Sequence, residues 1–342
     1  MTAGASGATA VTSGITTLAT IDDAGQPATF PLYWASTAGP RSLVVVFHGH
    51  GHDAADWAAA GELTAAAARD NALVVAPETT VTTAPNGKGT FDTVDEEARD
   101  AAAAIAWGRA TYHTGNTILL CVSMGCSGLA YFIDALGRPA TGDADARFVQ
   151  SQHVGPIDGV LVSEGLSNLV ETWAEATAAD PVSAAEIEQE TGGTPATAAG
   201  GYRSRSLALL PKARISRLLL RQVGIVHDVD DGLVPANQAA ETRAAFAAAE
   251  VLYHGYTVVR NGVTNCDTTN QTTGTSYIGK YVEQYTGSSV VSDNLDKDLC
   301  LAGHASETSP TTPVMRTTFT LLQNMTAGGI GPGETPIYIN VK

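Results

Sequence analysis

The sequence has few basic residues and no long apolar run, and these two absences exclude several kinds of partner. Its 342 residues include 19 lysines and arginines against 35 aspartates and glutamates, which gives a net charge of −16. Such an acidic chain is disfavoured as a partner of nucleic acid or of anionic membrane surfaces. No apolar stretch approaches the roughly 20 residues that a membrane span requires. The first ten residues also lack the basic and apolar regions of a secretory signal peptide.

Cysteine is scarce as well, with Cys121, Cys126, Cys266 and Cys300 as the four examples. No two of them have the C-x-x-C spacing, which argues against a zinc site. Cys266 and Cys300 bracket a polar, turn-rich segment, and we expect them to form a disulfide, with two unrelated thiols as the alternative. Such a bond would imply an oxidising compartment. We interpret Cys121 and Cys126 first as small buried residues, and second as a further disulfide.

The pattern of apolar residues predicts one α/β domain over residues 1–342. Hydrophobic residues make up 44% of the chain, which fits a large core. Residues 14–21 and 28–35 are typical of a β-hairpin. Further apolar runs predict strands at residues 42–47, 72–76, 117–122, 157–163, 217–226 and 251–259. Helical patterns lie between them and after them, with examples at residues 95–109, 237–250 and 313–325. This alternation predicts a mostly parallel sheet with helices on both faces.

The alternation lapses twice, and we interpret both lapses as lid-like insertions, at about residues 164–216 and 260–300. Such segments lie over the carboxyl edge of the sheet, where folds of this class place loops that carry function. Within the first, residues 191–201 are rich in glycine and threonine and indicate a flexible break. Four aromatic residues of these regions either line an apolar cleft or pack the insertions onto the sheet: Trp173, Tyr202, Tyr253 and Tyr277.

One stretch, residues 117–136, combines a buried strand, a tight turn with a central serine, and a helix. This order predicts a nucleophile elbow, in which Ser123 is held in a strained conformation above the sheet. The residues two before and two after the serine must be small. Gly125 meets that requirement, whereas Cys121 stands where a glycine is usual. The simpler alternative is a serine that only serves the turn.

A serine nucleophile needs a base, and the base needs an acid that orients it. The best acid candidate is Asp231, in a loop that follows a predicted strand, with Asp230 and Asp228 as competitors. A helix cap or a solvated acidic loop is the structural alternative. The base candidate is His304, which precedes the last predicted helix. The eight histidines of the chain make any single one weak evidence, so the order Ser123, Asp231, His304 carries the prediction.

The negative oxygen of an acyl-transfer intermediate needs two N–H donors. We expect the backbone N–H of Met124, directly after the serine, and that of His50, in the loop after the strand at 42–47. His48 and His52 alternate with His50 and could suggest a metal site, but the glycines between them suit a turn better than a set of ligands. The sequence therefore indicates neither a metal nor a cofactor.

These residues resemble the α/β-hydrolase superfamily over about residues 14–326, outside the two insertions. The order serine, acid, histidine is that of the superfamily and excludes the chymotrypsin and subtilisin orders. Residues 47–57 look like the oxyanion strand of secreted polyhydroxybutyrate depolymerases and feruloyl esterases. Ser123-Met-Gly is similar to the elbow of bacterial cutinases and polyester hydrolases. The loop at 226–235 and Gly303-His304 look like the acid loop and the Gly-His of the superfamily.

The resemblance and the residues together predict a secreted serine ester hydrolase, a monomer by default, that works through an acyl-enzyme. The resemblance implies a polyester, a feruloyl or acetyl polysaccharide ester, or a lipid ester as substrate. A serine peptidase of the prolyl-oligopeptidase type is the second hypothesis. A binding protein with the hydrolase fold and no activity is the third, and it predicts no labelling by a serine-directed phosphonate.

Overall fold

One sheet runs through the structure, a computed structural model that describes residues 10–78, 89–229, 231, 233–261, 304 and 313–340. Within these residues the sheet has nine strands in the order β1-β2-β4-β3-β5-β6-β7-β8-β9. β1 and β2 form the predicted antiparallel hairpin, β2 also pairs antiparallel with β4, and the remaining pairs are parallel. The strands are β1 (Val11–Ile21), β2 (Pro27–Thr37), β3 (Ser42–Phe47), β4 (Ala72–Pro77), β5 (Asn116–Val122), β6 (Gly159–Ser163), β7 (Gln222–Asp228), β8 (His254–Asn261) and β9 (Gly333–Asn340).

The central strand β3 is apolar from Leu43 to Phe47 because both of its faces are buried. In β3, Leu43, Val45 and Phe47 belong to one core cluster, whereas Val44 and Val46 belong to the other. Successive side chains of a strand point to opposite faces, so a strand covered on both sides needs an uninterrupted apolar run. The continuous run from residue 42 to residue 47 therefore predicted both the strand and its position inside the sheet.

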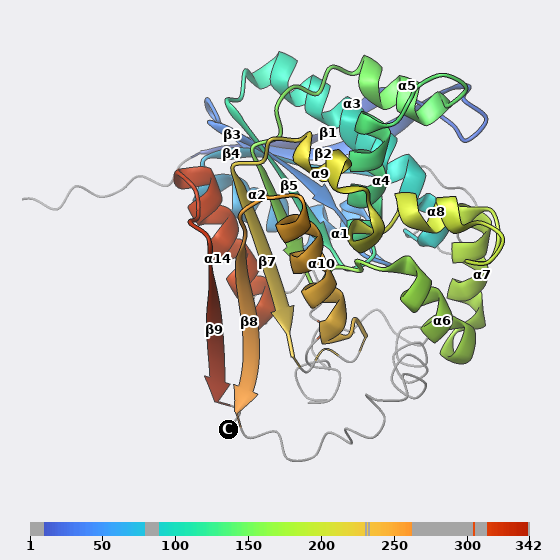
Figure 1. Cartoon of the computed structure of the whole chain (residues 1–342). Coiled ribbons are helices and arrows are strands. Elements are labelled where there is room, and N and C mark those ends of the chain that lie inside the picture. The colour runs from blue at the N-terminus through green and yellow to red at the C-terminus, as the bar shows by residue number, and fades with distance from the viewer. Residues whose placement is uncertain are drawn as a thin grey trace, which may run out of the picture.

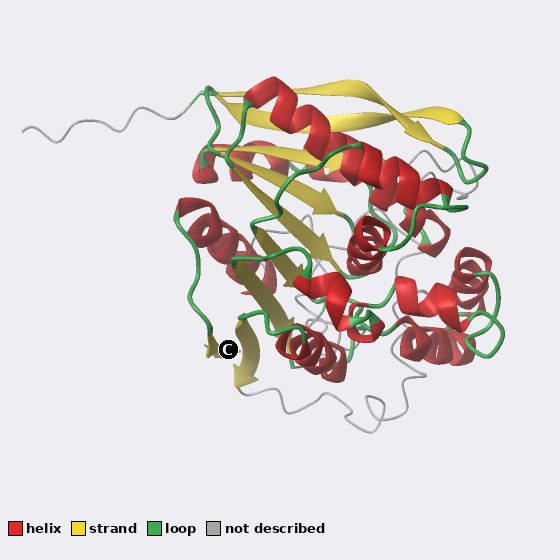
Figure 2. Ribbon diagram, turned by 45° about the horizontal axis from the view of Figure 1, so that its top comes forward, coloured by secondary structure: helices red, strands yellow, loops and turns green. Residues whose placement is uncertain are grey.

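Helices cover both faces of the sheet (Figures 1 and 2). The core cluster on one face includes residues of α3 (Val94–Tyr112), α4 (Gly125–Gly137), α5 (Ala144–Ser151) and α10 (Ala236–Ala248). The cluster on the other face includes residues of α1 (Ala54–Ala59), α2 (Glu62–Asp70) and α14 (Pro313–Ala327). The α/β architecture predicted from the sequence is confirmed, and the parallel strands place the ends of β5, β6 and β7 at one edge.

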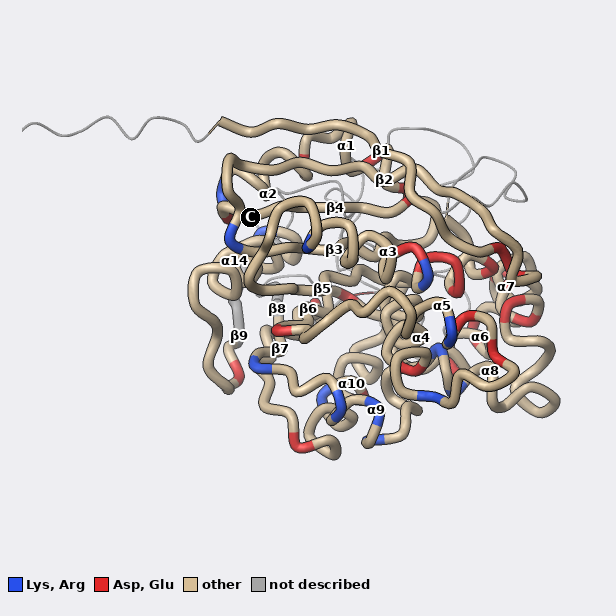
Figure 3. The backbone as a smooth tube through the Cα atoms, turned by 90° about the horizontal axis from the view of Figure 1, so that it is seen from above, with Lys and Arg blue, Asp and Glu red and all other residues tan. Residues whose placement is uncertain are grey.

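The first predicted insertion is helical and is attached to the start of α3. It contains α6 (Leu169–Ala179), α7 (Pro181–Thr191), α8 (Ala199–Ser204), η2 (Leu207–Leu209) and α9 (Lys212–Ser216). The Glu190 carboxylate accepts a hydrogen bond of 2.9 Å from the backbone N–H of Asp95. The Arg205 guanidinium pairs with Asp95 and, at 3.4 Å, with Glu190. Acidic residues gather around the beginning of α3, α6 and α7 (Figure 3), and the buried Arg205 compensates part of that charge.

The break predicted at residues 191–201 is present as a turn between α7 and α8, in which the N–H groups of Thr197 and Ala198 donate to the Thr194 carbonyl at 2.9 and 2.8 Å. The Thr191 hydroxyl donates to the Ile187 carbonyl at 2.7 Å and closes the end of α7, and α8 begins at Ala199. A Cβ on Gly201 would collide with the Thr191 carbonyl. The glycine is therefore present because the chain packs closely against itself here, and not because the segment lacks structure.

Other elements also differ from the sequence prediction. α5 and β9 were not predicted, although Thr335, Ile337 and Ile339 alternate as a strand pattern should. β7 begins at Gln222 and not at residue 217, because α9 and a turn occupy the residues before it. The second predicted insertion lies outside the described residues from 262 onward, as do Cys266, Cys300 and Tyr277. In the described ranges, no helix is long and apolar enough to cross a membrane.

Candidate active site

Ser123 lies between β5 and α4 with a backbone φ of 51°. A non-glycine residue in this left-handed region costs about 1 kcal/mol or more, so its surroundings must hold it there. Its N–H donates to the Ser163 carbonyl at 3.1 Å, and its own carbonyl accepts from Leu166 N–H at 3.1 Å. A Cβ on Gly125 would collide with the Phe47 carbonyl. The turn therefore has the strained serine and the obligatory small residue that the sequence predicted.

A disulfide joins Cys121 to Cys126 and spans the serine turn, with their Cα atoms 4.9 Å apart. Both residues are fully buried, as predicted. Our preferred interpretation of them as unbonded thiols is nevertheless wrong, and the second interpretation holds. The elbow brings the end of β5 back against the first turn of α4, so two residues with a sequence separation of 5 come within bonding reach. The predicted bond between Cys266 and Cys300 falls outside the described residues.

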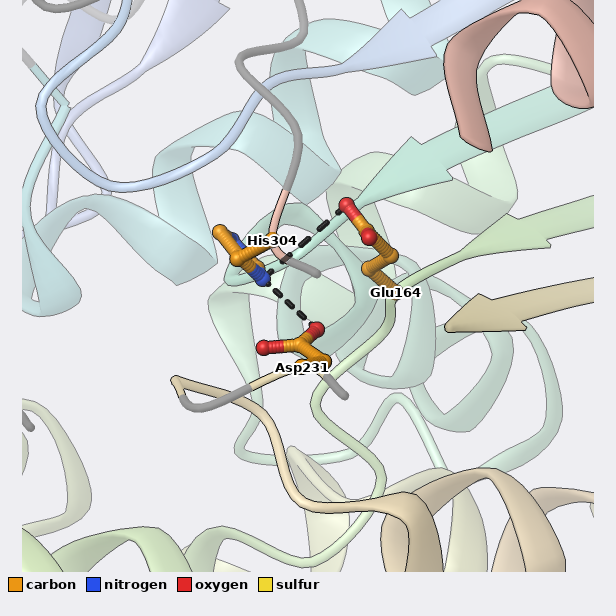
Figure 4. A group of neighbouring side chains, drawn as sticks. All are labelled: Glu164, Asp231 and His304. Atoms are coloured by element: carbon orange, nitrogen blue, oxygen red, sulfur yellow. Dashed lines mark hydrogen bonds and ion pairs between the residues drawn. The ribbon is translucent and has the colours of Figure 1, made fainter. Parts of the chain in front are cut away.

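The structure brings the predicted acid and base together (Figure 4). The Nδ1 atom of His304 lies 2.8 Å from Oδ2 of Asp231, and each residue is 5% exposed. The other carboxylate oxygen, Oδ1, accepts hydrogen bonds of 2.8 Å from the N–H groups of Leu233 and Val234. Among the competing acids, Asp228 is the last residue of β7, and Asp230 is outside the described residues. The loop thus fixes Asp231 and aims it at the histidine ring.

The environment of Asp231 favours its charged form. Burial by itself would raise the pKa of the Asp231 carboxyl, but the charge and the hydrogen bond of His304 outweigh burial and hold this pKa below its ordinary value. The neighbouring His227 behaves in the opposite way, because burial lowers its pKa to about 4. His227 is consequently neutral at neutral pH.

A further residue of the site, Glu164, was not predicted. It follows β6 directly and is fully buried, and its Oε2 atom lies 3.9 Å from Nδ1 of His304 (Figure 4). Its position after a strand that ends at the same edge as β5 and β7 was the available signal in the sequence. That signal is weak, because several polar residues follow predicted strands.

Glu164, Asp231 and His304 also have side chains that metals accept as ligands, and their ligand atoms lie within 4.8 Å of one another. They are the one such group in the part of the chain that the structure describes. A tetrahedral zinc ion with ligands at about 2.0–2.1 Å separates two ligand atoms by about 3.3 Å. The 2.8 Å between His304 and Asp231 is instead typical of a charge-assisted hydrogen bond.

The loop after β3 forms a tight turn, in which His52 N–H donates to the Gly49 carbonyl at 3.2 Å. The side chain of His50 is 39% exposed, and its Nε2 atom lies 3.2 Å from Oε2 of Glu186 in α7. Met124 is the N-terminal cap of α4, so its N–H lies at the positive end of the helix dipole. The two N–H groups thus belong to the elbow and to the neighbouring loop, and their role toward an oxyanion stays a prediction.

The aromatic residues of the insertion follow the packing alternative where the structure describes them. Tyr202 is fully buried in the core cluster of the α3 face. The indole N–H of Trp173 donates to Glu188 at 2.9 Å, and Trp173 and Tyr253 pack partly buried against the same cluster. These residues attach the insertion and the start of β8 to the domain.

A mostly parallel sheet with helices on both faces, a strained serine after β5 and an acid after β7 define the α/β-hydrolase fold, which this chain has. Carboxyl esterase 2 from the mycorrhizal fungus Tuber melanosporum aligns with 94% of this chain and 88% of its own, at 11% identity and a TM-score of 0.56. A carboxylesterase from Lactobacillus plantarum covers 81% of this chain and 92% of its own, at 16% identity and a TM-score of 0.49. Acylaminoacyl peptidase from Pyrococcus horikoshii covers 80% of this chain and 40% of its own, at 11% identity and a TM-score of 0.49. No family model and no curated protein matches the sequence.

Proposed function

We propose that this protein is a serine hydrolase of carboxylic esters, with Ser123, His304 and Asp231 as its catalytic triad. The observation that carries the proposal is the 2.8 Å hydrogen bond between His304 and Asp231, at the same sheet edge as the strained Ser123. Because the buried Asp231 carboxylate accepts the hydrogen bond of Nδ1–H, the other ring nitrogen of His304, Nε2, serves as the base. The lowered pKa of Asp231 supports this assignment, because the acid then stays ionised while the ring takes up a proton.

In the proposed mechanism, the Ser123 hydroxyl attacks the ester carbonyl while Nε2 of His304 takes its proton. The N–H groups of Met124 and His50 donate to the oxygen that becomes negative. Collapse of the tetrahedral intermediate breaks the bond to the alcohol, which leaves with the proton from His304. Water then enters, gives a proton to His304, and attacks the acyl-enzyme. The carboxylic acid is released, and Ser123 regains its proton.

The test is hydrolysis of p-nitrophenyl esters from acetate to palmitate by the wild-type protein and by Ser123→Ala. We expect the substitution to lower kcat by about 10⁵-fold or more, because no other group replaces the nucleophile. Ser127→Ala is the matched control, since it removes another buried hydroxyl from the same turn region and should retain most activity. Full activity of Ser123→Ala would refute the proposal. Faster cleavage of peptide anilides than of the matching aryl esters would favour the peptidase alternative.

Within the ester class, we propose a polymeric ester as the natural substrate and secretion as the destination. The support for the substrate is the similarity of residues 47–57 and of Ser123-Met-Gly to polyester and feruloyl ester hydrolases. Release of hydroxybutyrate from a polyhydroxybutyrate film, measured beside release of ferulate from methyl ferulate, separates the two substrate classes. The disulfide supports secretion, because such bonds persist in oxidising compartments.

A further inference from the structure

Glu164 brings a second carboxylate to the ring nitrogen that Asp231 already binds. Asp231 comes from the loop after β7, and Glu164 from the end of the neighbouring β6, so the two acids approach His304 from different strands (Figure 4). The Oε2 atom of Glu164 is 3.9 Å from Nδ1, against 2.8 Å for Oδ2 of Asp231. A charge-assisted hydrogen bond of about 2.8 Å therefore requires Glu164 to approach by about 1 Å. Rotation about the side-chain bonds of a glutamate can supply such a movement.

The backbone of Glu164 is fixed on both sides. Its N–H donates to the Val226 carbonyl in β7 at 2.9 Å, and its φ of 48° lies in the left-handed region. A Cβ on the next residue, Gly165, would lie 2.5 Å from Sγ of Cys126, so the chain is pressed against the disulfide of the elbow. Leu166 N–H then donates to the Ser123 carbonyl. The same contacts that hold the nucleophile thus hold Glu164.

A fully buried carboxyl group on a left-handed backbone is unfavourable on two counts. Desolvation of a carboxylate costs several kcal/mol, and the backbone conformation costs about 1 kcal/mol more. Costs of this kind concentrate at functional sites, where the position of a charge matters more than stability.

We propose that Glu164 is a positioning residue that acts as a second acid for His304. Its carboxylate can accept the Nδ1 proton of His304 when Asp231 is absent, so the ring keeps the tautomer that presents Nε2 to Ser123. In the wild-type protein the same negative charge stabilises the imidazolium that forms during the reaction. This inference rests on the proposed function for its kinetic effect, but the contact between Glu164 and His304 has a readout that does not depend on activity.

The kinetic test compares Asp231→Ala with Asp231→Ala/Glu164→Gln on p-nitrophenyl butyrate. A triad that loses its single acid loses about 10⁴-fold in kcat. We expect Asp231→Ala to lose only about 10²-fold, with KM little changed, and the double variant to reach the full loss of about 10⁴-fold. Glu164→Gln alone should cost less than about tenfold, because Asp231 remains. Equal kcat values for Asp231→Ala and the double variant would overturn the proposal.

Two further variants test whether the kinetic difference comes from misfolding or from the loss of any buried carboxyl group. Asp231→Asn keeps an oxygen for the N–H groups of Leu233 and Val234, so the comparison can be repeated if Asp231→Ala does not fold. Glu62→Gln is the matched control, because Glu62 is also a buried glutamate, 5% exposed, but belongs to α2. Added to Asp231→Ala, Glu62→Gln should leave kcat unchanged. A loss equal to that caused by Glu164→Gln would mean that any buried carboxyl has this effect, and would overturn the proposal.

The second readout is the proton NMR signal of Nδ1–H of His304, recorded in the inactive Ser123→Ala background. We expect a downfield signal that persists in Ser123→Ala/Asp231→Ala and disappears when Glu164→Gln is added. Loss of the signal with Asp231→Ala alone would refute the second acid. If Ser123→Ala proves fully active, the proposed function fails, while this signal still reports whether Glu164 binds His304.

Discussion

The disulfide across the nucleophile turn should contribute both to stability and to activity, and Cys121→Ala/Cys126→Ala tests both. The bond closes a loop with a sequence separation of 5. Loop closure of that size removes about 2 kcal/mol of conformational entropy from the unfolded chain. Each substitution also removes a sulfur atom from the core, at about 0.8 kcal/mol for a group of methylene size. Together these terms predict a loss of about 3–4 kcal/mol in the free energy of unfolding.

The same bond constrains Ser123, which lies inside the closed loop. If the serine relaxes from its left-handed conformation, restoring it costs about 1 kcal/mol in each catalytic cycle, which corresponds to a fall in kcat of about fivefold. Urea unfolding and hydrolysis of p-nitrophenyl butyrate measure the two effects. Peptide mapping without reductant first verifies that the wild-type protein has the Cys121–Cys126 bond.

The matched control for packing is Val44→Ala. It removes two carbon atoms from a fully buried position in β3 but leaves the cross-link intact, so it should cost about 2 kcal/mol. The difference between the two variants isolates the contribution of the cross-link. A double cysteine variant within about 0.5 kcal/mol of the wild-type protein would refute the reasoning, because a constraint of this kind acts mainly on the unfolded chain.

Three further predictions concern the elbow, the pH dependence of stability and the helical insertion. Gly125→Ala should abolish most activity and destabilise the fold, because its Cβ would collide with the carbonyl at the end of β3; normal activity and stability would contradict that geometry. Burial raises the pKa of Glu96 from 4.5 to about 7, so its contribution to stability is complete below pH 4.5 and is lost as pH rises through 7. Glu96→Gln should therefore be more stable than wild type at pH 8 by at most about 3 kcal/mol and similar near pH 4.5, as measured by urea unfolding at the two pH values. Arg205→Ala should cost about 3–5 kcal/mol, since it leaves the Asp95 and Glu190 carboxyl groups, whose side chains are only 13% and 11% exposed, without their cation.

The controls for these predictions come from exposed or equivalent groups. Arg221→Ala removes a guanidinium that is 78% exposed and pairs at 3.6 Å with Asp158, and it should cost less than about 1 kcal/mol. A similar cost for the two arginine variants would contradict the role of Arg205 inside the insertion. For Glu96, an equal fall in stability between pH 4.5 and pH 8 in wild type and variant would show that other groups cause the pH dependence.

The sequence alone determined the features that depend on neighbours along the chain. The run of β-branched residues at 42–47 specified a strand buried on both faces, because side-chain period and burial are local properties. The order of strand, small-residue turn and helix around Ser123 specified the elbow for the same reason. Asp231 and His304 were predicted as acid and base because each has a recognisable local context in a serine, acid, histidine order, and the structure places their side chains 2.8 Å apart.

The tertiary structure decided which residues meet across different elements. Glu164 approaches His304 because β6 and β7 are neighbours in register, and Glu164 N–H binds the Val226 carbonyl. Cys121 bonds to Cys126 because the elbow turns the helix back against the strand. The turn between α7 and α8 is compact because Gly201, which has no Cβ, lets α8 pack against the carbonyl of Thr191 at the end of α7. Composition and periodicity do not encode such contacts, since each depends on the placement of two segments in space and not on the preference of either one.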